Sequence, residues 1–423
     1  MIRVSNLKFI FLVPLFFLMT IAPQLFSFIK LPLLLFSFFL IFITIIPQKK
    51  LYSKVYIIWF FFYLSYYLIW ISYGALLGNP GIYDYFRVQV LWPIIYFILI
   101  SSITSLNIIS KIFKILIVYT TIISIYLFYK FLEIINLVPP IINFEGESFA
   151  IGIHSGYIQI VSLSIGSLTF LMPFIIVFVS NYNDLYNSIL SKSKAYIILF
   201  ITIIIILLTG RRALWGSLFI TFILNWIINS NFLKKEMFYN NFKKPFIFLT
   251  TLILIFTTAY FTLNDTINYE NLTNRLVEEF KTENTTPRQL QSNALLNGFY
   301  NNPLFGSGFG VGVKDVVRST ERPWTYELTY HLYLFNTGII GSLFFFILLS
   351  FPIYRFYILK KYHPEYNIFT KPLIISYIIV LFASSSNPYF TSSFDFLWML
   401  FLPIGVLNRL EIESKNKSFN ANY

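Results

Sequence analysis

The sequence predicts an all-α, polytopic membrane protein, and three observations carry that prediction. Hydrophobic residues make up 57% of the chain and charged residues only 12%, proportions unlike those of soluble domains. Apolar runs of about 18–22 residues recur from end to end, which is the length a helix needs to cross about 30 Å of hydrocarbon. Lys and Arg gather in alternate connections between these runs, as they do in membrane proteins.

We expect about twelve transmembrane helices that form a single integral membrane domain over residues 1–423. In chain order, the expected spans lie near 8–26, 29–47, 55–75, 89–106, 112–133, 157–180, 195–209, 213–230, 245–263, 330–350, 372–387 and 392–408. The first run resembles a signal peptide, but no small-x-small cleavage site stands out and the second span follows at once, so we expect it to be retained. The chain holds no cysteine, which excludes disulfides and thiol chemistry.

The charge distribution predicts the orientation. If both termini are cytoplasmic, the inside connections collect most of the 31 basic residues and few of the 18 acidic ones. The net charge of +13 is therefore a membrane signal, and we expect no nucleic-acid partner. With this orientation the segment 264–330 forms a large, partly helical loop that faces the periplasm or the exterior.

The segment 264–330 is polar, although apolar runs long enough to span a bilayer stand on both sides of it. A protein that only holds itself in a membrane does not need such a segment, so we interpret it as the working surface of a membrane enzyme. Its charged and titratable side chains include Arg275, Arg288, Arg318, Arg322, Glu327 and, at its exit, His331.

Arg211 and Arg212 lie between two expected spans, on the side where positive charge is disfavoured. Almost no loop separates those spans, so both side chains lie at or just below the membrane surface, where an ionisable residue costs about 2.5–3.5 kcal/mol on insertion scales. Two interpretations are open: an interfacial pair that snorkels to lipid phosphates, or an anion site that faces a cavity inside the helix bundle.

Arg288 opens an expected amphipathic helix. Thr286 is suited to cap the helix and Pro287 to occupy its first turn, and apolar residues at Leu290, Ala294, Leu295 and Phe299 follow before Asn301-Asn302-Pro303. The free N–H groups of a helix start and the helix dipole favour an anion beside Arg288. A solvated loop arginine is the alternative.

His331 lies where the polar segment re-enters the membrane. It is either a hydrogen-bonded interfacial side chain or a general base, kept neutral by nearby arginines. Glu327, one helical turn earlier, is placed to orient His331 or to act as the base itself.

Two further features admit a structural and a functional interpretation. The run Gly306-Ser307-Gly308-Phe309-Gly310-Val311-Gly312 lacks the Lys-Ser/Thr ending of a P-loop, so we favour a hinge or tight-turn loop over a phosphate cradle. His154 is interpreted as structural, with contact to a sugar as the alternative. Three histidines this far apart give no metal-ligand spacing, so we expect neither metal nor cofactor.

Several of these residues together resemble the O-antigen polymerase and O-antigen ligase superfamily of bacterial inner-membrane proteins. The resemblance covers roughly residues 195–350 by motif and the whole chain by topology. The matching motifs, in order, are Thr209-Gly210-Arg211-Arg212-Ala213, then Arg288, then Asn302-Pro303-Leu304-Phe305-Gly306-Ser307-Gly308-Phe309-Gly310, then His331 followed by Gly338-Ile339-Ile340-Gly341.

The resemblance implies roles for individual residues. It assigns Arg212 and Arg288 to the diphosphate of an undecaprenyl-linked glycan and His331 to the acceptor site. The family often has Asn after this histidine, whereas Leu332 follows here, so Tyr330 or Asn336 would supply the polar contact. The residues expected to bind substrate are Arg211, Arg318, Arg322, His154 and Tyr330.

The chemistry of glycosyl transfer fits these residue types. Departure of a lipid diphosphate requires its charge to be stabilised, which arginines do bidentately, and a neutral histidine adds roughly 10²–10⁴-fold as base. We therefore expect a metal-independent, inverting polymerase that transfers glycan from one undecaprenyl diphosphate to another lipid-linked repeat unit, with a chain-length regulator as a further partner. The alternatives are an O-antigen ligase with lipid A-core as acceptor, and a lipid-linked oligosaccharide flippase. A flippase should carry charges along its central spans, whereas here they gather at span ends and in one loop.

Overall fold

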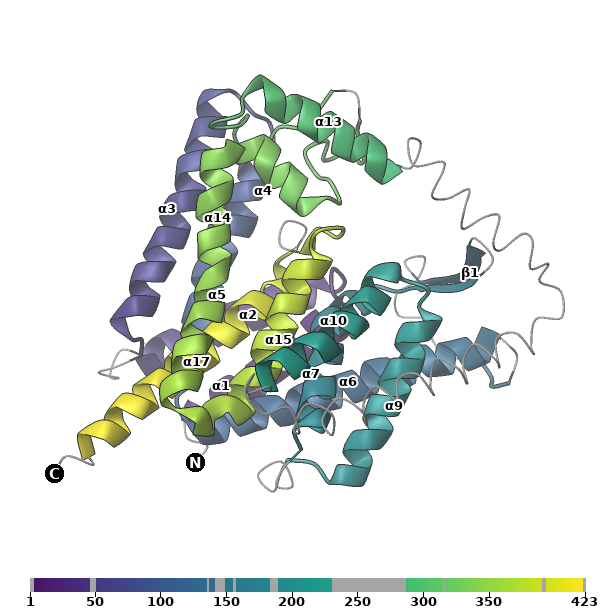
Figure 1. The fold of residues 1–423 in the computed structure, drawn as a ribbon, viewed down its shortest axis with the longest axis vertical. Coiled ribbons are helices and arrows are strands. Elements are labelled where there is room, and N and C mark those ends of the chain that lie inside the picture. Colours follow the sequence, from purple (N-terminus) through teal and green to yellow (C-terminus); the bar gives the residue numbers. More distant parts are fainter. Residues whose placement is uncertain are drawn as a thin grey trace.

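The computed structural model describes residues 4–45, 51–134, 137–140, 149–154, 157–182, 189–229, 287–314, 316–389 and 393–420. The expected span 245–263 and residues 264–286, with Arg275 among them, lie outside this part of the chain. The described residues are mainly helical (Figure 1).

The elements follow one another along the chain with one short β-hairpin among helices. The α-helices are α1 (Val4–Ile21), α2 (Ser27–Ile45), α3 (Lys54–Leu76), α4 (Ile82–Phe86), α5 (Trp92–Ile100), α6 (Leu106–Ile134), α7 (Ile165–Ser180), α9 (Lys192–Leu208), α10 (Arg212–Asn229), α13 (Pro287–Asn301), α14 (Thr329–Tyr362), α15 (Asn367–Ala383) and α17 (Trp398–Asn420). Shorter elements are the strands β1 (Ala150–His154) and β2 (Tyr157–Val161), the π-helical turn η1 (Arg87–Leu91), and the 3₁₀ turns η3 (Pro364–Tyr366) and η4 (Phe394–Phe396).

Five helical segments among the described residues are long and apolar enough to cross a membrane, and shorter apolar helices accompany them. The five are Lys54–Leu76, Ile82–Ile100, Leu106–Glu133, Thr329–Tyr362 and Pro364–Ala383. Helices of this length and composition support the prediction of an α-helical membrane protein.

The expected span 157–180 is only partly helical. Residues Tyr157–Val161 form strand β2, which pairs antiparallel with β1 so that His154 lies opposite Tyr157, and helix α7 begins only at Ile165. The sequence Tyr157-Ile158-Gln159-Ile160-Val161 is rich in β-branched residues, which suit a strand, and a short apolar run cannot be told from a helix by periodicity alone.

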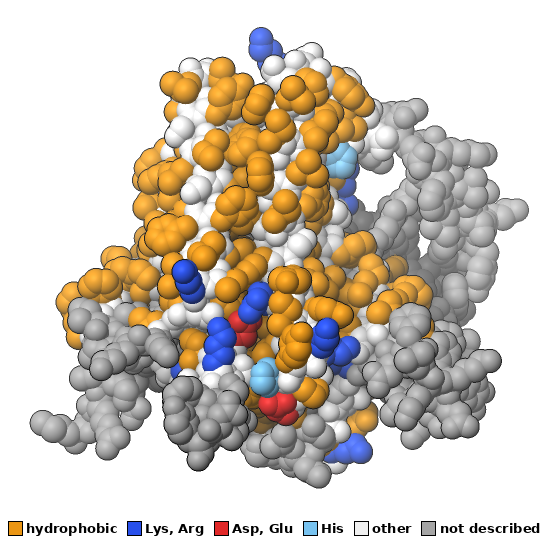
Figure 2. Space-filling model, turned by 60° about the vertical axis from the view of Figure 1, so that its left-hand side comes forward, with side chains coloured by type: hydrophobic (Ala, Val, Ile, Leu, Met, Phe, Trp, Pro, Cys, Tyr) orange, Lys and Arg blue, Asp and Glu red, His pale blue; other side chains and the backbone are white. Residues whose placement is uncertain are grey.

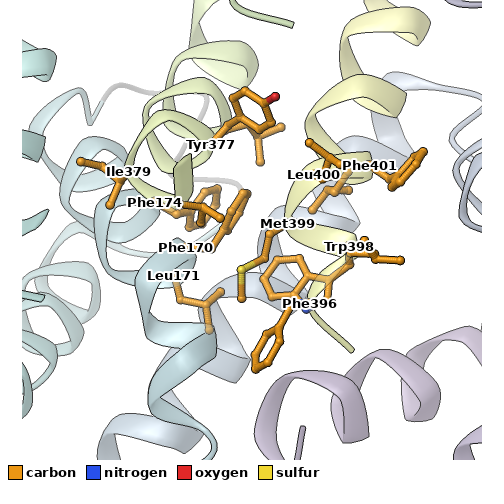
Figure 3. Close-up of a cluster of buried hydrophobic side chains, with 14 of the residues drawn as sticks. Phe170, Leu171, Phe174, Tyr377, Ile379, Phe396, Trp398, Met399, Leu400 and Phe401 are labelled. Atoms are coloured by element: carbon orange, nitrogen blue, oxygen red, sulfur yellow. The ribbon is translucent and has the colours of Figure 1, made fainter. Parts of the chain in front are cut away.

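Helices α7, α15 and α17 form the centre of the hydrophobic core. Every residue from Ile165 to Val179 of α7 is buried, as expected of a helix that is apolar on all sides. Figure 3 shows Phe170 and Phe174 of α7 beside Tyr377 of α15 and Met399 of α17. These four buried side chains bring the three helices into contact in the core.

The outer sides of α3 and α14 are apolar and exposed. Figure 2 shows hydrophobic side chains over much of this face, with Lys and Arg gathered toward its lower end. The exposed hydrophobic residues include Ile57, Ile58, Phe61, Phe62, Leu68 and Ile69 of α3 and Leu343, Phe344, Phe346 and Ile347 of α14. An apolar band that ends in basic residues suits contact with a bilayer.

Helix α14 is broken at Gly338. This glycine has φ 63° and ψ −169°, so the chain changes direction and the segment 329–337 leans away from the longer segment that follows (Figure 1). The amides of Ile339 and Ile340 donate to the carbonyls of Pro303 and Leu304 at 2.9 and 3.2 Å. The loop at residues 302–305 therefore satisfies the free amides that a new helix start exposes.

The glycine run at residues 306–312 is a tight-turn loop packed against α3 and α14. Gly308 has a φ of 73°, and a Cβ there would lie 2.5 Å from the Cα of Gly74 in α3. The amides of Ser307 and Gly308 donate to the carbonyls of Phe335 and Asn336 at 2.9 and 2.8 Å. These amides are therefore not available to cradle a phosphate, and the tight-turn interpretation is confirmed.

Candidate functional site

A cavity of about 680 Å³ lies between the loop 302–328, the turn between α1 and α2, helix α4 and the segment 387–396. Arginines dominate its charged lining. The charged residues on its wall are Asp84, Arg87, Arg211, Arg318, Arg322 and Asp395. Three of the residues predicted to bind substrate, Arg211, Arg318 and Arg322, thus line one cavity although they come from segments more than 100 positions apart.

Asp84 holds two of these arginines. Arg87 Nη2 lies 3.0 Å from Asp84 Oδ1, and Arg322 Nε lies 3.7 Å from the other carboxylate oxygen, Oδ2. Arg87 opens the π-helical turn between α4 and α5, and π-helical turns frequently occur at functional sites. One carboxylate therefore joins a membrane helix to the loop 302–328.

Glu327 holds two arginines in the same way. Arg288 Nε lies 2.8 Å from Glu327 Oε2, and Arg318 Nη2 lies 3.3 Å from Oε1. Both arginines remain exposed to solvent in part, at 57% and 40% of their side-chain surface. Because both oxygens of Glu327 already face guanidinium groups, its geometry suits an arginine holder better than a proton acceptor.

Arg288 stands at the start of α13, as the sequence predicts, because the helix begins at Pro287 and ends at Asn301. The buried face of this helix is formed by Gln291, Leu295 and Phe299, whereas Leu290, expected on that face, is exposed. The Gln291 side chain accepts a hydrogen bond from the amide of Glu327 at 3.0 Å. This bond fixes Glu327 beside the first turn of α13, so Arg288 can reach its carboxylate.

A small separate core under α13 positions the loop that carries the arginines. It consists of Leu295, Tyr326, Leu332 and Phe335. The hydroxyl of the fully buried Tyr326 accepts from the amide of Val313 at 2.8 Å and donates to the carbonyl of Val316 at 3.0 Å. Burial raises the pKa of Tyr326, so the hydroxyl stays protonated and can keep donating.

Arg211 differs from the other cavity arginines because its guanidinium pairs with no carboxylate among the described residues. Its Nε is buried and has no hydrogen-bond partner in the described part of the chain. It lies on the turn between α9 and α10, next to Gly210, which has a φ of 63°. A charged group that faces a cavity without a counter-ion is a candidate for binding an anionic ligand.

His331 and Tyr330 stand on the broken-off first segment of α14. His331 is half-buried and its imidazole pairs with no described residue, but it does not line the cavity, whereas its neighbour Leu332 does. Tyr330 does not line the cavity, and its hydroxyl donates to the carbonyl of Leu381 at 2.5 Å. Asn336 is buried and does not line the cavity, but its amide donates at 3.4 Å to the hydroxyl of Tyr85, which does.

For Arg212 and His154 the structure describes the backbone alone. Arg212 is the first residue of α10 and follows the cavity residue Arg211 directly. His154 is the last residue of β1. Among the described residues no three His, Asp or Glu side chains are grouped so that they could hold a metal ion.

Sequence reasoning missed a buried ion pair beneath the cavity. Lys30 Nζ lies 2.8 Å from Asp395 Oδ1, and the two side chains are 0% and 1% exposed. Each is an isolated charge in an expected span, and such charges usually mark function or a buried partner. Asp84 and Arg87 were missed in the same way, although Asp84-Tyr85-Phe86-Arg87 places two charges at the edge of an apolar run.

The charges of the site leave a surplus of positive charge. Arg87 and Arg322 share one carboxylate, and Arg318 shares another with Arg288, which does not line the cavity, so each group of three side chains is positive overall. Arg211 adds a further positive charge, while Asp395 is neutralised by Lys30. The arrangement can therefore hold a ligand that carries more than one negative charge.

No protein-family model matches the chain, and no curated protein matches it significantly. Function is therefore inferred from the residues of the cavity.

Proposed function

We propose that this protein is a polysaccharide repeat-unit polymerase of the bacterial inner membrane. It would transfer a growing glycan from one undecaprenyl diphosphate carrier to a second lipid-linked repeat unit. The observation that carries the proposal is the convergence of Arg87, Arg211, Arg318 and Arg322 on one cavity in a chain of apolar helices.

The ligand best suited to these charges is a diphosphate ester attached to a lipid. A diphosphate offers several oxygens to guanidinium forks, and a hydrogen bond to a charged group contributes about 1.5–3 kcal/mol. An apolar helix bundle suits the lipid tail. The expected twelve spans and periplasmic loop belong to this proposal, because they would place the cavity where lipid-linked sugars are assembled outside the cytoplasm.

The transfer step is a substitution at the anomeric carbon of the donor sugar. A hydroxyl oxygen of the acceptor sugar bonds to that carbon while the bond from carbon to diphosphate oxygen breaks. The electron pair leaves with undecaprenyl diphosphate, and the hydroxyl proton passes to a base. Preorganised arginines stabilise the departing charge, and each donor of this kind contributes about 2.7–4 kcal/mol to a transition state.

His331 is the residue we propose as the base. Its imidazole is half-buried and makes no bond to a described residue, so a ring nitrogen is free to accept a proton. Glu327 is the weaker candidate because Arg288 and Arg318 already face both of its oxygens. Direct attack in one step would invert the anomeric centre.

The test is the glycan banding pattern of a host that lacks the protein, complemented with wild type, Arg211→Ala, Arg212→Ala or Lys314→Ala. Lys314 is the matched control, because it lies in the same loop as Arg318, is exposed and does not line the cavity. We expect a ladder with wild type and Lys314→Ala, and a single attached repeat unit with the arginine variants.

Other outcomes would identify another function. Loss of all attached glycan, with polymer accumulating on undecaprenyl diphosphate, would mean that the protein is a ligase. Accumulation of single lipid-linked units on the cytoplasmic side would mean that it is a flippase. A normal ladder with Arg211→Ala would remove the support that the cavity arginines give to the proposal, and a normal ladder with Arg212→Ala would remove the role that the resemblance gives to Arg212.

A further inference from the structure

The turn between α1 and α2 has a strained backbone. Gln24 has a φ of 67° and Phe26 a φ of 55°, and these are the two non-glycine residues with positive φ in the described chain. Side chains other than glycine rarely adopt this conformation, and it persists where surrounding structure enforces it, often at functional sites.

The buried ion pair enforces this conformation. Asp395 Oδ2 accepts a hydrogen bond from the Gln24 amide at 2.7 Å, while Oδ1 pairs with Lys30. Lys30 in turn donates to the carbonyl of Ala22 at 2.7 Å. The pair therefore hydrogen-bonds to the backbone of the turn on both sides of Pro23. Ser393 donates to the same carboxylate at 2.9 Å.

The strained turn places the side-chain amide of Gln24 on the wall of the cavity. Gln24 is exposed and lines the cavity, and its side chain bonds to no described residue. Ser27, at the start of α2, is likewise exposed, lines the cavity and has no side-chain partner among the described residues. Phe26, the other strained residue, does not line the cavity.

The residues that line the cavity are of two chemical kinds. The arginines come from η1, the turn between α9 and α10, and the loop 302–328, whereas Gln24 and Ser27 are neutral. An amide and a hydroxyl each donate and accept, so they match sugar hydroxyls, which do the same. On the wall of the same cavity, the rings of Trp92 and Phe394, which are tilted by 31° with centroids 4.8 Å apart, offer apolar surface to the C–H faces of a sugar.

We propose that Gln24 and Ser27 form a glycan subsite, in which they hydrogen-bond a neutral sugar carried on the lipid diphosphate, and that the Lys30–Asp395 pair holds the turn in place for this contact. This inference rests on the proposed function, since it names the part of the site that reads the sugar. On this proposal the strained turn and the buried ion pair both serve to position Gln24 and Ser27 for contact with the sugar.

The experiment compares two ligands on the full-length protein in nanodiscs. One is undecaprenyl diphosphate without sugar, and the other is the lipid-linked repeat unit extracted from a host that lacks the protein. Gln24→Ala should weaken binding of the sugar-bearing lipid by about three- to tenfold, the effect of one neutral hydrogen bond, and leave binding of the bare lipid unchanged. Arg211→Ala should weaken both.

Two glycine variants separate the contact from the conformation. Gln24→Gly and Phe26→Gly should each raise the melting temperature, because glycine adopts positive φ without strain. Only Gln24→Gly should weaken binding of the sugar-bearing lipid. A protein that is stabilised by Gln24→Gly but binds that lipid normally would overturn the subsite.

The outcomes also distinguish failure of the subsite from failure of the proposed function. If wild type binds both lipids and Gln24→Ala binds the sugar-bearing lipid equally well, the subsite is wrong and the lipid diphosphate site stands. Loss of bare-lipid binding in Gln24→Ala would likewise overturn the subsite, because Gln24 would then serve the diphosphate. If wild type binds neither lipid, the proposed function itself fails.

Discussion

Arg288 and Glu327 form an ion pair of 2.8 Å although they stand 39 positions apart in the chain. The pair links the loop 302–328 to the start of α13. Arg318 pairs with the other carboxylate oxygen of Glu327. All three side chains are partly exposed to solvent, so the ion pairs stabilise the fold by no more than about 0–1 kcal/mol each. Their importance therefore lies in where they hold the two arginines.

Glu327→Gln should raise the affinity for undecaprenyl diphosphate severalfold. The substitution keeps the size of the side chain and removes the anion that competes with phosphate for Arg288 and Arg318. Glu321→Gln is the control, since Glu321 is exposed, does not line the cavity and pairs with no described residue. Binding to nanodisc-embedded protein is the measurement, and a fall in affinity would mean that Glu327 is needed to position the arginines.

Arg288→Lys should lose as much activity as Arg288→Ala, roughly a hundredfold by comparison with the loss of one preorganised donor. A lysine supplies a point charge but not the planar fork that binds two phosphate oxygens. Polymer synthesis in membranes is the measurement. Near-normal activity in the lysine variant would show that charge alone is enough.

Arg211→Ala should abolish polymer synthesis without lowering the melting temperature. Its guanidinium has no counter-ion among the described residues, so folding loses no ion pair when it is removed. Arg355→Ala is the contrasting variant, because Arg355 makes two bonds to the buried Glu411, and breaking a buried pair costs about 3–5 kcal/mol. If Arg211→Ala unfolds as readily as Arg355→Ala, Arg211 is a structural residue.

Gly308→Ala should destabilise the protein by several times more than Gly78→Ala. Both glycines have a φ near 74°, so each alanine introduces the left-handed penalty of about 1–2 kcal/mol. At Gly78 nothing lies within 4 Å of the new Cβ, whereas at Gly308 it would meet the backbone of Gly74 at 2.5 Å. Melting temperatures in detergent compare the two, and equal losses would contradict the close packing of the loop against α3.

Removing either partner of the Lys30–Asp395 pair should cost about 3–5 kcal/mol, because the remaining charge is buried without its partner. Lys30→Met combined with Asp395→Asn should cost much less than the sum of the single variants. A double-mutant cycle on the free energy of unfolding measures this coupling. Additive losses would mean that the two side chains do not act as a pair.

The sequence was sufficient where a local signal decides the structure. Thr286-Pro287 predicts the start of α13 and Asn301-Asn302-Pro303 its end, because caps and proline act within one turn. The arginines were found because charges between apolar runs are conspicuous in one dimension. The cavity that they share could not be predicted from the sequence, since it depends on how distant helices pack.

Pairing across the chain is what the sequence could not supply. Lys30 and Asp395 are each visible as isolated charges, but 365 positions separate them and nothing local shows that they meet. The same holds for Glu327. A continuous helix would have placed it one turn before His331, but α14 begins only at Thr329, and the Glu327 carboxylate pairs with Arg288. Tyr330, expected in the site, instead donates to the backbone of α15.

The break at Gly338 makes the loop and the helix a single cooperative unit. The amides of Ile339 and Ile340 take their acceptors from Pro303 and Leu304 and not from the preceding turn. Local opening of the loop would therefore expose these two amides to solvent, and their hydrogen exchange would report the free energy of that opening. The exchange rates of Ile339 and Ile340, which lie in an apolar helix, thus measure the stability of the loop that carries the arginines.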